Sequence, residues 1–440
     1  MLLRRHGSFS GGIDLPDEKR ATLGLSIEAC PCPRLLRVPL APCGGSPAEL
    51  SVKEGDSVTA GEKIATGSEG VDIYAPASGR IGKTVTAKVA CATGTINSLA
   101  IEILAVRTTS AIRSLAPVYD WRNASALDIR NHLNSGGLTT ARPDIEPLGK
   151  WVERGRRAGC ELIIMNVVES QPYVTADHRL LAEHGSEVIR GLMIIAKALA
   201  AEEMILAVDQ RHTSYYRKLV GAARACGIQM VALPPKYPVG NDLVLVKVLQ
   251  RRETPIGKEP FDVGVGVTDA STCFAAYRWV ACQSPQTARV VTVNGNGQLN
   301  RGNYWAPYGT DCTNLIEGGE ETVVHGGPMG PVNLASGAVV CASTDAVLNI
   351  NTLPRHSPSP CIRCGWCTDH CPSRLNVRSL NDCFELGNLA RARRLKVQAC
   401  VECGVCSYVC PARLDLCGRL VWMKRQCSRV SKSGKREVSA

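Results

Sequence analysis

Two stretches decide the fold of the C-terminal part of this chain: Cys361-Ile-Arg-Cys364-Gly-Trp-Cys367-Thr-Asp-His-Cys371-Pro372 and Cys400-Val-Glu-Cys403-Gly-Val-Cys406-Ser-Tyr-Val-Cys410-Pro411. Both have the pattern C-x-x-C-x-x-C-x-x-x-C-P, which is typical of segments that hold two [4Fe–4S] clusters. Three thiolates on one tight loop can bind three irons of a cubane, whereas the cysteine before the proline ligates the cluster of the other run. We therefore predict one cluster bound by Cys361, Cys364, Cys367 and Cys410, and a second bound by Cys400, Cys403, Cys406 and Cys371.

Structural zinc is the alternative for these cysteines, because zinc sites also use paired C-x-x-C units. A zinc ion takes four ligands, which leaves the third cysteine of each run and the trailing proline without a role. Gly365 and Gly404 also fit a cluster, since a residue without a Cβ lets the backbone pass close to inorganic sulfur. We therefore favour iron–sulfur clusters over zinc.

The bulk composition is that of a multidomain protein with ordinary cores. The chain has 440 residues, enough for about three domains, and 45% of them are hydrophobic. Thirteen of its 21 cysteines lie outside the two runs, without a pairing rhythm. We interpret these thirteen as reduced, mostly buried thiols of a cytoplasmic protein, since disulfides need an oxidising compartment. They are Cys30, Cys32, Cys43, Cys91, Cys160, Cys226, Cys273, Cys282, Cys312, Cys341, Cys383, Cys417 and Cys427.

Charge and hydropathy narrow the range of partners. We expect no signal peptide and no membrane span, because no sufficiently long apolar stretch is present. The formal net charge is +11, and much of it follows Arg391. The basic segment from Lys424 to Lys435 is interpreted as a solvated, disordered end, or else as a segment that docks on an acidic partner or an anionic surface. Nucleic acid is not an expected partner, because only 5% of the residues are aromatic and no stacking module is present.

The first part of the chain is predicted to be a β module, within an α/β multidomain protein. In residues 1–120, the segment Glu49 to Ala65 alternates apolar and polar residues around Gly-Asp turns, and Ala75 to Ile81 follows it. This pattern resembles the barrel-sandwich fold of biotinyl and lipoyl carrier domains. The hairpin that holds the modified lysine in such carriers reads Gly67 to Asp72 here and has no lysine. We therefore expect a structural module without a carrier role.

Residues 121–255 are predicted to form a Rossmann-like α/β module. Short apolar strands alternate with helices, which indicates a mostly parallel sheet with helices on its faces. The predicted strands are 162–168, 204–208 and 229–233, and the predicted helices are 180–199 and 215–225. Ligands of such sheets bind at the carboxyl ends of the strands, so the loop after the first strand is the candidate site. This loop runs from Asn166 to Arg179.

The remaining chain is predicted to contain three parts. Residues 256–352 fit a β-grasp module, with a strand at 290–293 and a short helix after Gly309-Thr310. A linker rich in proline and serine then leads to a two-cluster, ferredoxin-like α-helical domain at 353–425. Within it, residues 378–396 are predicted to be helical and to space the two cysteine runs. Residues 426–440 form a basic tail.

The order of these modules resembles the RnfC family, and four further motifs carry the resemblance. Gly11-Gly-Ile-Asp-Leu-Pro16 resembles GGIHPP, and Glu169-Ser-Gln-Pro-Tyr-Val-Thr-Ala-Asp-His-Arg179 resembles ECEPYITADDR. Tyr237-Pro-Val-Gly-Asn-Asp242 resembles YPxGGE, and Gly326-Gly-Pro-Met-Gly330 resembles GGPMMG. The family forms the NADH- and FMN-binding arm of a membrane ion-pumping complex and is similar to the flavin subunit of complex I. The cobalamin reductase of propanediol microcompartments is similar to it.

The chain departs from this family at the flavin loop. The family's GGAGFPT holds the flavin and its phosphate through backbone N–H groups. The aligned residues here are Ala141-Arg-Pro-Asp-Ile-Glu-Pro147, which contain no glycine. Pro143 and Pro147 lack donors, and Asp144 and Glu146 add charge that would repel a phosphate. At the strand end, Asn166 and Glu169 remain as the flavin ligands that the resemblance implies, although ordinary capping of the strand end would explain both equally well. The resemblance therefore implies two [4Fe–4S] clusters, whereas FMN and NADH binding stays open.

Together these features predict an RnfC-like protein that passes electrons between a nicotinamide/flavin couple and a redox partner. The alternatives are a cluster relay or scaffold subunit that has lost its own FMN/NADH site, and a microcompartment protein similar to cobalamin reductase. The implied partner is a redox protein or other subunits of an electron-transfer complex. The expected location is the cytoplasm, either peripherally on the inner face of the cell membrane or within a microcompartment. Whether the chain is itself an NADH-dependent oxidoreductase stays open, as do its catalytic residues.

Overall fold

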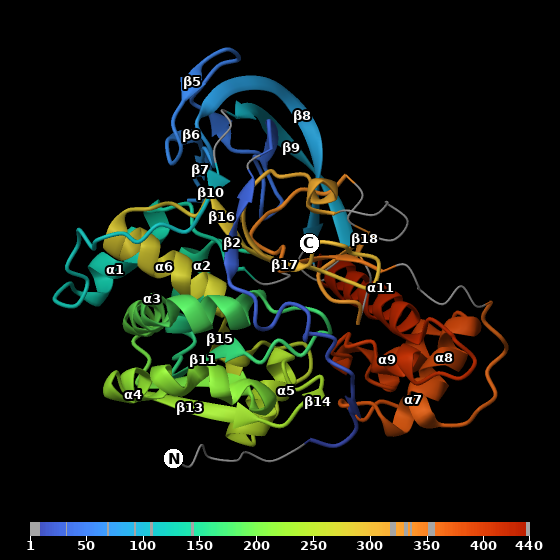
Figure 1. The fold of residues 1–440 in the computed structure, drawn as a ribbon. Helices are drawn as coiled ribbons and strands as arrows, with labels where there is room; N and C mark the ends of the chain where they lie inside the picture. The colour runs from blue at the N-terminus through green and yellow to red at the C-terminus, as the bar shows by residue number, and fades with distance from the viewer. Residues whose placement is uncertain are drawn as a thin grey trace.

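The computed structural model describes most of the chain, in ten segments. These are residues 9–31, 33–67, 70–91, 94–105, 109–141, 145–316, 323–329, 333–334, 337–350 and 357–436. Figure 1 shows the N-terminal β module at the top, the α/β module below it, and the cysteine-rich C-terminal domain to the side. No helix in these segments combines the length and the apolar character needed to cross a membrane.

The N-terminal β module is built from two small sheets that face each other. The strands of the first sheet, in spatial order, are β3 (Leu35–Pro39), β9 (Gly94–Ala105), β8 (Gly79–Cys91) and β5 (Ser57–Val58). Those of the second are β4 (Glu49–Leu50), β6 (Lys63–Thr66) and β7 (Ile73–Tyr74). Leu36, Ile64, Ile81 and Ile103 are buried between them, as the alternating pattern of the sequence predicts.

A four-stranded parallel sheet forms the centre of the α/β module. Its strands, in spatial order, are β13 (Ile228–Leu233), β12 (Glu203–Asp209), β11 (Leu162–Val167) and β15 (Val265–Thr268). Alternate residues of β11 face opposite sides: Ile163 and Met165 pack against α3 (Ala176–Leu199) and α6 (Ala270–Cys282). Ile164 packs on the other face, against α5 (Asp242–Gln250). The remaining helices of this part are α1 (Ala126–Ser135), α2 (Leu148–Arg157), η1 (Gln210–Tyr216), α4 (Arg217–Ala225) and η2 (Pro260–Val263).

The strand and helix positions predicted for this module are confirmed, with two differences. Helix α3 begins at Ala176, and residues 210–216 form a 3₁₀ helix before α4. Strand β15 lies beyond the predicted boundary at residue 255, so the parallel sheet continues into the range assigned to the next module.

A seven-stranded sheet joins distant parts of the chain. Its strands, in spatial order, are β10 (Thr109–Ser110), β2 (Ile27–Pro31), β17 (Gly302–Pro307), β16 (Ala288–Asn294), β20 (Ala346–Asn349), β18 (Val323–His325) and β19 (Asn333–Leu334). The predicted strand at 290–293 lies within β16, and the short helix after Gly309-Thr310 is η3 (Cys312–Leu315). Because β17 pairs with β2, residues from the predicted 1–120 module complete this sheet. The β-grasp assignment of residues 256–352 stays a prediction. A separate pair, β1 (Ile13–Asp14) with β14 (Lys236–Tyr237), ties the N-terminal segment to the α/β module.

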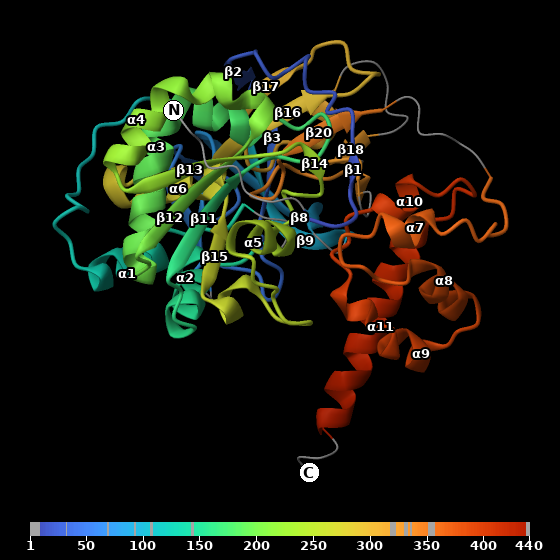
Figure 2. The ribbon, with the colours of Figure 1, turned by 90° about the horizontal axis from the view of Figure 1, so that it is seen from below.

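The C-terminal domain is helical and lies beside the α/β module (Figures 1 and 2). Its elements are α7 (Trp366–Asp369), α8 (Val377–Glu385), α9 (Leu389–Arg394), η4 (Val397–Ala399), α10 (Val405–Tyr408) and α11 (Leu416–Arg436). The helix predicted at 378–396 is two helices, because Gly387 adopts a left-handed conformation between them.

The basic tail is not disordered up to Arg436, which corrects our first interpretation of residues 424–435. Helix α11 runs through this segment and projects from the domain in Figure 2. Leu416, Leu420, Met423 and Cys427 lie on one face of it and pack into the core of the cluster domain. Their spacing of three or four residues is that of an amphipathic helix.

The crossing of α3 and α6 gives a direct test of the fold. A Cβ on Gly191 would overlap the backbone carbonyl of Cys273. Gly191→Ala should therefore lower the free energy of unfolding by about 1–3 kcal/mol, because backbone cannot move aside as a side chain can. Gly221→Ala is the matched control in α4, where nothing lies within 4 Å of the added methyl group.

The control substitution should leave stability unchanged or raise it by up to about 1 kcal/mol, as expected for glycine to alanine within a helix. Urea unfolding followed by circular dichroism measures both variants. Equal stability of the two would show that α3 and α6 do not cross at Gly191.

Candidate metal centres

Two cavities in the C-terminal domain are lined by cysteines from both runs. The first is lined by Cys361, Cys364, Cys367 and Cys410. The second is lined by Cys371, Cys400, Cys403 and Cys406. The fold thus brings together the two crossed sets predicted from the sequence, although their role as cluster ligands stays a prediction. Within the segments that the structure describes, no three His, Cys, Asp or Glu side chains lie close enough together to hold a single metal ion.

The local backbone of the two runs is repeated, which explains how both sets of thiols reach their cavities. Gly365 and Gly404 have φ of 88° and 78° and begin the short helices α7 and α10. Arg363 and Glu402, one residue before the second cysteine of each run, have φ of 58° and 57°. A chain that turns through left-handed conformations twice in three residues can place all its thiols on the inner side of one loop.

Burial makes the second cavity unfavourable for free thiolates. Desolvation raises the pKa of Cys400 and of Cys403 to about 12, and raises the pKa of Cys406 further. Thiols with such pKa values are neutral at pH 7, and a bound metal is what turns them into thiolates. The residues present therefore fit an iron–sulfur cluster, whose iron would supply the compensating positive charge.

The sequence did not reveal that Cys417 lines the second cavity as well. Burial raises the pKa of its thiol to about 12, and its backbone N–H donates to Ser407 Oγ at 2.8 Å. It stands in the first turn of α11, outside either run, so only its place on the buried face of an amphipathic helix could have indicated it.

The second cavity lies against the α/β module. Tyr237 Oη donates to the carbonyl of Cys403 at 2.7 Å, and Asn241 Nδ2 donates to the carbonyl of Val401 at 3.3 Å. In the first run, the carbonyl of His370, next to Cys371, accepts from Gly12 N–H at 2.8 Å. A Cβ on Gly11 would stand 2.6 Å from the Cys371 carbonyl oxygen. Two of the motifs that resemble the RnfC family therefore help to hold the C-terminal domain in place. They are Gly11-Gly12 and the segment from Tyr237 to Asp242.

The two residues predicted at the strand end form hydrogen bonds within the protein. Asn166 Nδ2 donates to the carbonyl of Gly240 at 2.8 Å, while its Oδ1 accepts from Val168 N–H at 3.2 Å. The carboxylate of Glu169 accepts from the N–H groups of Asp177 and His178 at 2.8 and 2.9 Å, which caps the start of α3. The capping interpretation thus describes what both side chains do in this structure, and their role toward a flavin stays a prediction.

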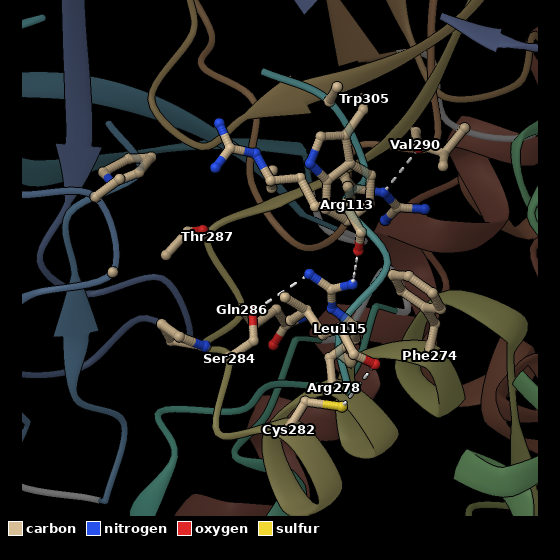
Figure 3. Close-up of a pocket in the computed structure, with 18 of the residues that line it drawn as sticks. Arg113, Leu115, Phe274, Arg278, Cys282, Ser284, Gln286, Thr287, Val290 and Trp305 are labelled. Carbon is tan, nitrogen blue, oxygen red and sulfur yellow. Dashed lines mark hydrogen bonds between the residues drawn. The ribbon is translucent and has the colours of Figure 1, made fainter. Parts of the chain in front are cut away.

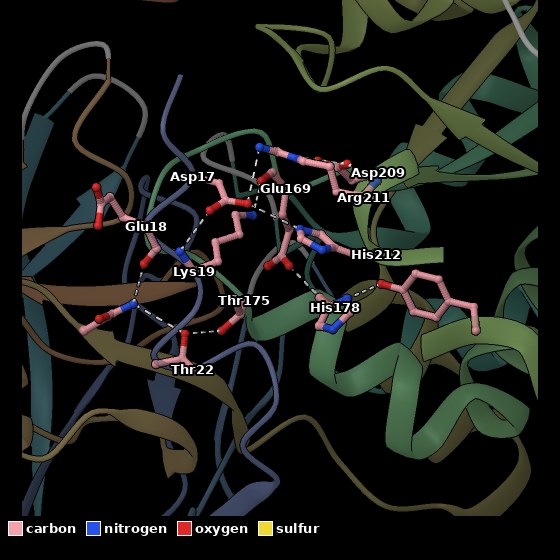
Figure 4. A network of polar contacts seen from close by, with 12 residues as sticks. Asp17, Glu18, Lys19, Thr22, Glu169, Thr175, His178, Asp209, Arg211 and His212 are labelled. Carbon is pink, nitrogen blue, oxygen red and sulfur yellow. Dashed lines mark hydrogen bonds and ion pairs between the residues drawn. The ribbon is translucent and has the colours of Figure 1, made fainter. Parts of the chain in front are cut away.

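A buried polar network surrounds Glu169 (Figure 4). The ammonium of Lys19 donates to the Glu169 carbonyl, and Asp17, Asp209 and Arg211 gather beside it. Burial lowers the pKa of Lys19, and lowers the pKa of His178 to about 3. Burial also raises the pKa of Asp177 to about 8. The carboxyl group of Asp177 accepts a hydrogen bond from Ser271 Oγ at 2.6 Å. The sequence did not reveal Lys19 as part of this region, because nothing in the local pattern marks it as buried.

The structure describes only part of the flavin loop. Arg142, Pro143 and Asp144 lie outside the described residues. Ala141 N–H donates to Thr272 Oγ1 at 2.9 Å, and Leu148 N–H donates to the Leu138 carbonyl at 2.9 Å, so both donors have partners.

Glu146 was predicted to repel a phosphate, but in the structure its negative charge is paired with Arg154. Its carboxylate accepts two hydrogen bonds from Arg154, at 2.6 and 2.8 Å, so it contributes less repulsion toward a phosphate than the sequence suggested. Among the described loop residues, the N–H groups of Ala141 and Glu146 donate within the protein, and Pro147 has no N–H.

Comparisons with known proteins support the module order. The RnfC barrel sandwich hybrid domain matches residues 7–104, the Nuo51 FMN-binding domain matches 147–278, and the 4Fe-4S dicluster domain matches 360–415. An RnfC-type subunit of an ion-translocating oxidoreductase complex from Serratia proteamaculans is 30% identical over 391 residues, which cover 84% of this chain and 54% of the relative. Over 84% of its length, the chain is similar to the RnfC subunit. The corresponding subunit from Edwardsiella ictaluri is 29% identical over 84% of this chain and 48% of its own length.

The chain spans about half the length of these curated RnfC relatives. Its match to the FMN-binding domain begins at Pro147, so the substituted loop residues 141–146 precede the matched range. A NAD⁺-reducing [NiFe]-hydrogenase gives a TM-score of 0.47 at 16% identity over 70% of this chain and 64% of that one, which assigns no function. Neither the family models nor these relatives point to a microcompartment.

Crossed ligation can be tested by matching spectra between single variants. Cys371→Ser should remove the same cluster as Cys403→Ser, and Cys410→Ser the same cluster as Cys364→Ser, because each pair lines one cavity. Each variant should lose about half of the bound iron. Electron paramagnetic resonance of the dithionite-reduced proteins shows which cluster remains.

Cys417→Ser is the matched control, since this thiol lines the second cavity outside the predicted ligand set. It should keep the full iron content. A Cys371→Ser spectrum that matches Cys364→Ser would contradict the crossed assignment.

Proposed function

We propose that this chain passes electrons through two [4Fe–4S] clusters, between a nicotinamide/flavin couple and a redox partner. The observation that carries the proposal is the pair of cavities, each lined by three thiols of one run and one of the other. Two intact sets of four thiols are what two cubanes need, and such clusters transfer one electron at a time. The names of the family's relatives, subunits of ion-translocating oxidoreductase complexes, agree with this function.

The second cluster is the proposed entry point. Hydrogen bonds from Tyr237 and Asn241 hold its loop against the α/β module. Gly240, in the same segment, accepts a hydrogen bond from Asn166 at the strand end. The first cluster is the proposed exit, because Cys364 is exposed and large apolar side chains surround its run. Ile362, Trp366 and Tyr408 are each more than half exposed. Exposed apolar residues of this kind are typical of a docking surface, and a redox partner would contact the cluster domain there.

A cluster relay that takes its electrons from a flavin on another subunit is the second candidate. It is favoured by the strand-end site, where the side chains of Asn166 and Glu169 and the N–H of Ala141 form hydrogen bonds within the protein. Nicotinamides deliver two electrons and clusters accept one, so some flavin must stand between them. In this version the partner subunit binds that flavin, and this chain supplies only the single-electron path.

Other subunits of the same complex are the proposed partners, and the proposed location is the cytoplasmic side of the membrane. Since no membrane-crossing helix is found in the described segments, attachment would run through partner subunits or through the basic residues of α11.

Reduction by dithionite and by NADH distinguishes a chain with its own flavin site from a cluster relay. In the full-length protein, loaded anaerobically with iron and sulfide to about eight irons per chain, dithionite should bleach the cluster absorbance. NADH should not bleach it within minutes, with or without added FMN, because Asn166, Glu169 and the N–H groups of Ala141 and Glu146 already form hydrogen bonds within the protein. Visible spectra before and after each reductant make the measurement.

Rapid bleaching by NADH in the presence of FMN would show that the chain forms its own flavin site and would overturn the relay. Four irons per chain, or zinc in their place, would overturn the two-cluster proposal itself.

A further inference from the structure

A further cavity of the described structure lies away from the two cysteine-lined cavities. Its volume is about 660 Å³, within the range of small-molecule sites. Three parts of the fold enclose it: the N-terminal β module through Ala77 and Ser78, helix α6, and strands β16 and β17. Figure 3 shows the arginine, aromatic and hydroxyl side chains that line it. Cavities between modules are common places for ligands, because each module supplies a different kind of contact.

The charged residues among its described lining are all arginines: Arg113, Arg278 and Arg289. Arg289 is buried and donates to the carbonyls of Val290 and Ala342, and it faces the buried carboxyls of Asp177 and Asp345. All three of its guanidinium nitrogens therefore have hydrogen-bond partners within the protein. This leaves Arg113 and Arg278 as the arginines of the lining that could bind an anionic ligand.

Arg278 is positioned firmly and is only weakly paired. It donates to the Arg113 carbonyl at 2.5 Å and lies over the ring of Phe274, 5.5 Å from its centre. Its side chain is 12% exposed, while the nearest carboxylate, Glu187 Oε2, is 3.9 Å away. Burial lowers the pKa of Arg278, as expected for a cation that is desolvated without close compensation. Binding of an anion would stabilise the charged guanidinium of Arg278.

Two aromatic residues line the same cavity. Phe274 and Trp305 meet edge to face, with ring centres 5.9 Å apart. The opposite wall, from the β module, carries small side chains, among them Ala60, Gly61 and Ala77. Small residues opposite aromatic ones leave room for a flat ring.

We propose that this cavity binds a mononucleotide, with its phosphate on Arg113 and Arg278 and its base beside Phe274 and Trp305. The cavity volume, the excess of cationic groups and the aromatic wall together fit a molecule that is both anionic and ring-bearing. The site is separate from the strand-end residues Asn166 and Glu169, which are not part of its lining. The proposal does not depend on electron transfer.

Calorimetry on the full-length, cluster-loaded protein tests this proposal. The probes are AMP, GMP and UMP, their nucleosides, and inorganic phosphate. At least one nucleotide should bind about tenfold or more tightly than its nucleoside and than phosphate, since only the nucleotide uses both walls. Failure of all three nucleotides to bind at millimolar concentration would overturn the proposal.

Three variants locate the site. Arg113→Ala combined with Arg278→Gln should weaken nucleotide binding about tenfold or more, and Thr287→Trp should abolish it by filling the cavity. Arg157→Ala is the matched control: it removes an exposed arginine, paired with Glu153, that does not line the cavity. Binding that survives both cavity variants, or that falls equally in the control, would contradict the assignment. Iron content and circular dichroism confirm that each variant is folded.

Discussion

The cluster domain depends on one constraint, which is that neither cysteine run can surround its cavity alone. Cys371 lines the cavity of the second run, and Cys410 lines that of the first. The chain between the runs must therefore return on itself, and α8 and α9 provide that return. Helix α11 then closes the core with Leu416, Leu420 and Met423. Burial disfavours the thiolate forms of Cys400 and Cys403, so a metal bound there would have to displace their protons.

The same constraint determines how the cluster domain meets the rest of the molecule. The backbone carbonyls of the two runs point outward, where Tyr237, Asn241 and Gly12 donate to them. These donors stand next to the strand ends, where doubly wound sheets bind their ligands. At that edge, however, Glu169 caps α3 and Asn166 binds the Gly240 carbonyl. The structure thus combines well-formed cluster cavities with a strand-end region whose polar groups bind one another.

Features of the structure that depend on residues close together in the sequence could be predicted, whereas features that join distant segments could not. The spacing of the cysteines in each run, including Cys371 and Cys410, was sufficient to predict which thiols share a cavity. Alternation of apolar strands and helices likewise predicted the parallel order around β11. Strand β15 and the pairing of β2 with β17 were not predicted, because they join segments distant in the chain.

Other features depended on tertiary contacts that no local pattern records. The tail was taken as disordered because its basic residues mask the buried stripe of α11. Glu146 was expected to repel a phosphate, but its pairing with Arg154 depends on the start of α2. The burial of Lys19 and the cavity beside Arg278 arise only where separate modules meet.

Spin counting tests most directly whether one chain holds two neighbouring cubanes. Full-length protein loaded with iron and sulfide is titrated anaerobically to full reduction and followed by electron paramagnetic resonance. Two adjacent cubanes should give about two spins per chain at full reduction, with broadening from the magnetic interaction between them. A single uncoupled spin per chain, with the remaining cysteines metal-free or bound to zinc, would contradict the presence of two clusters.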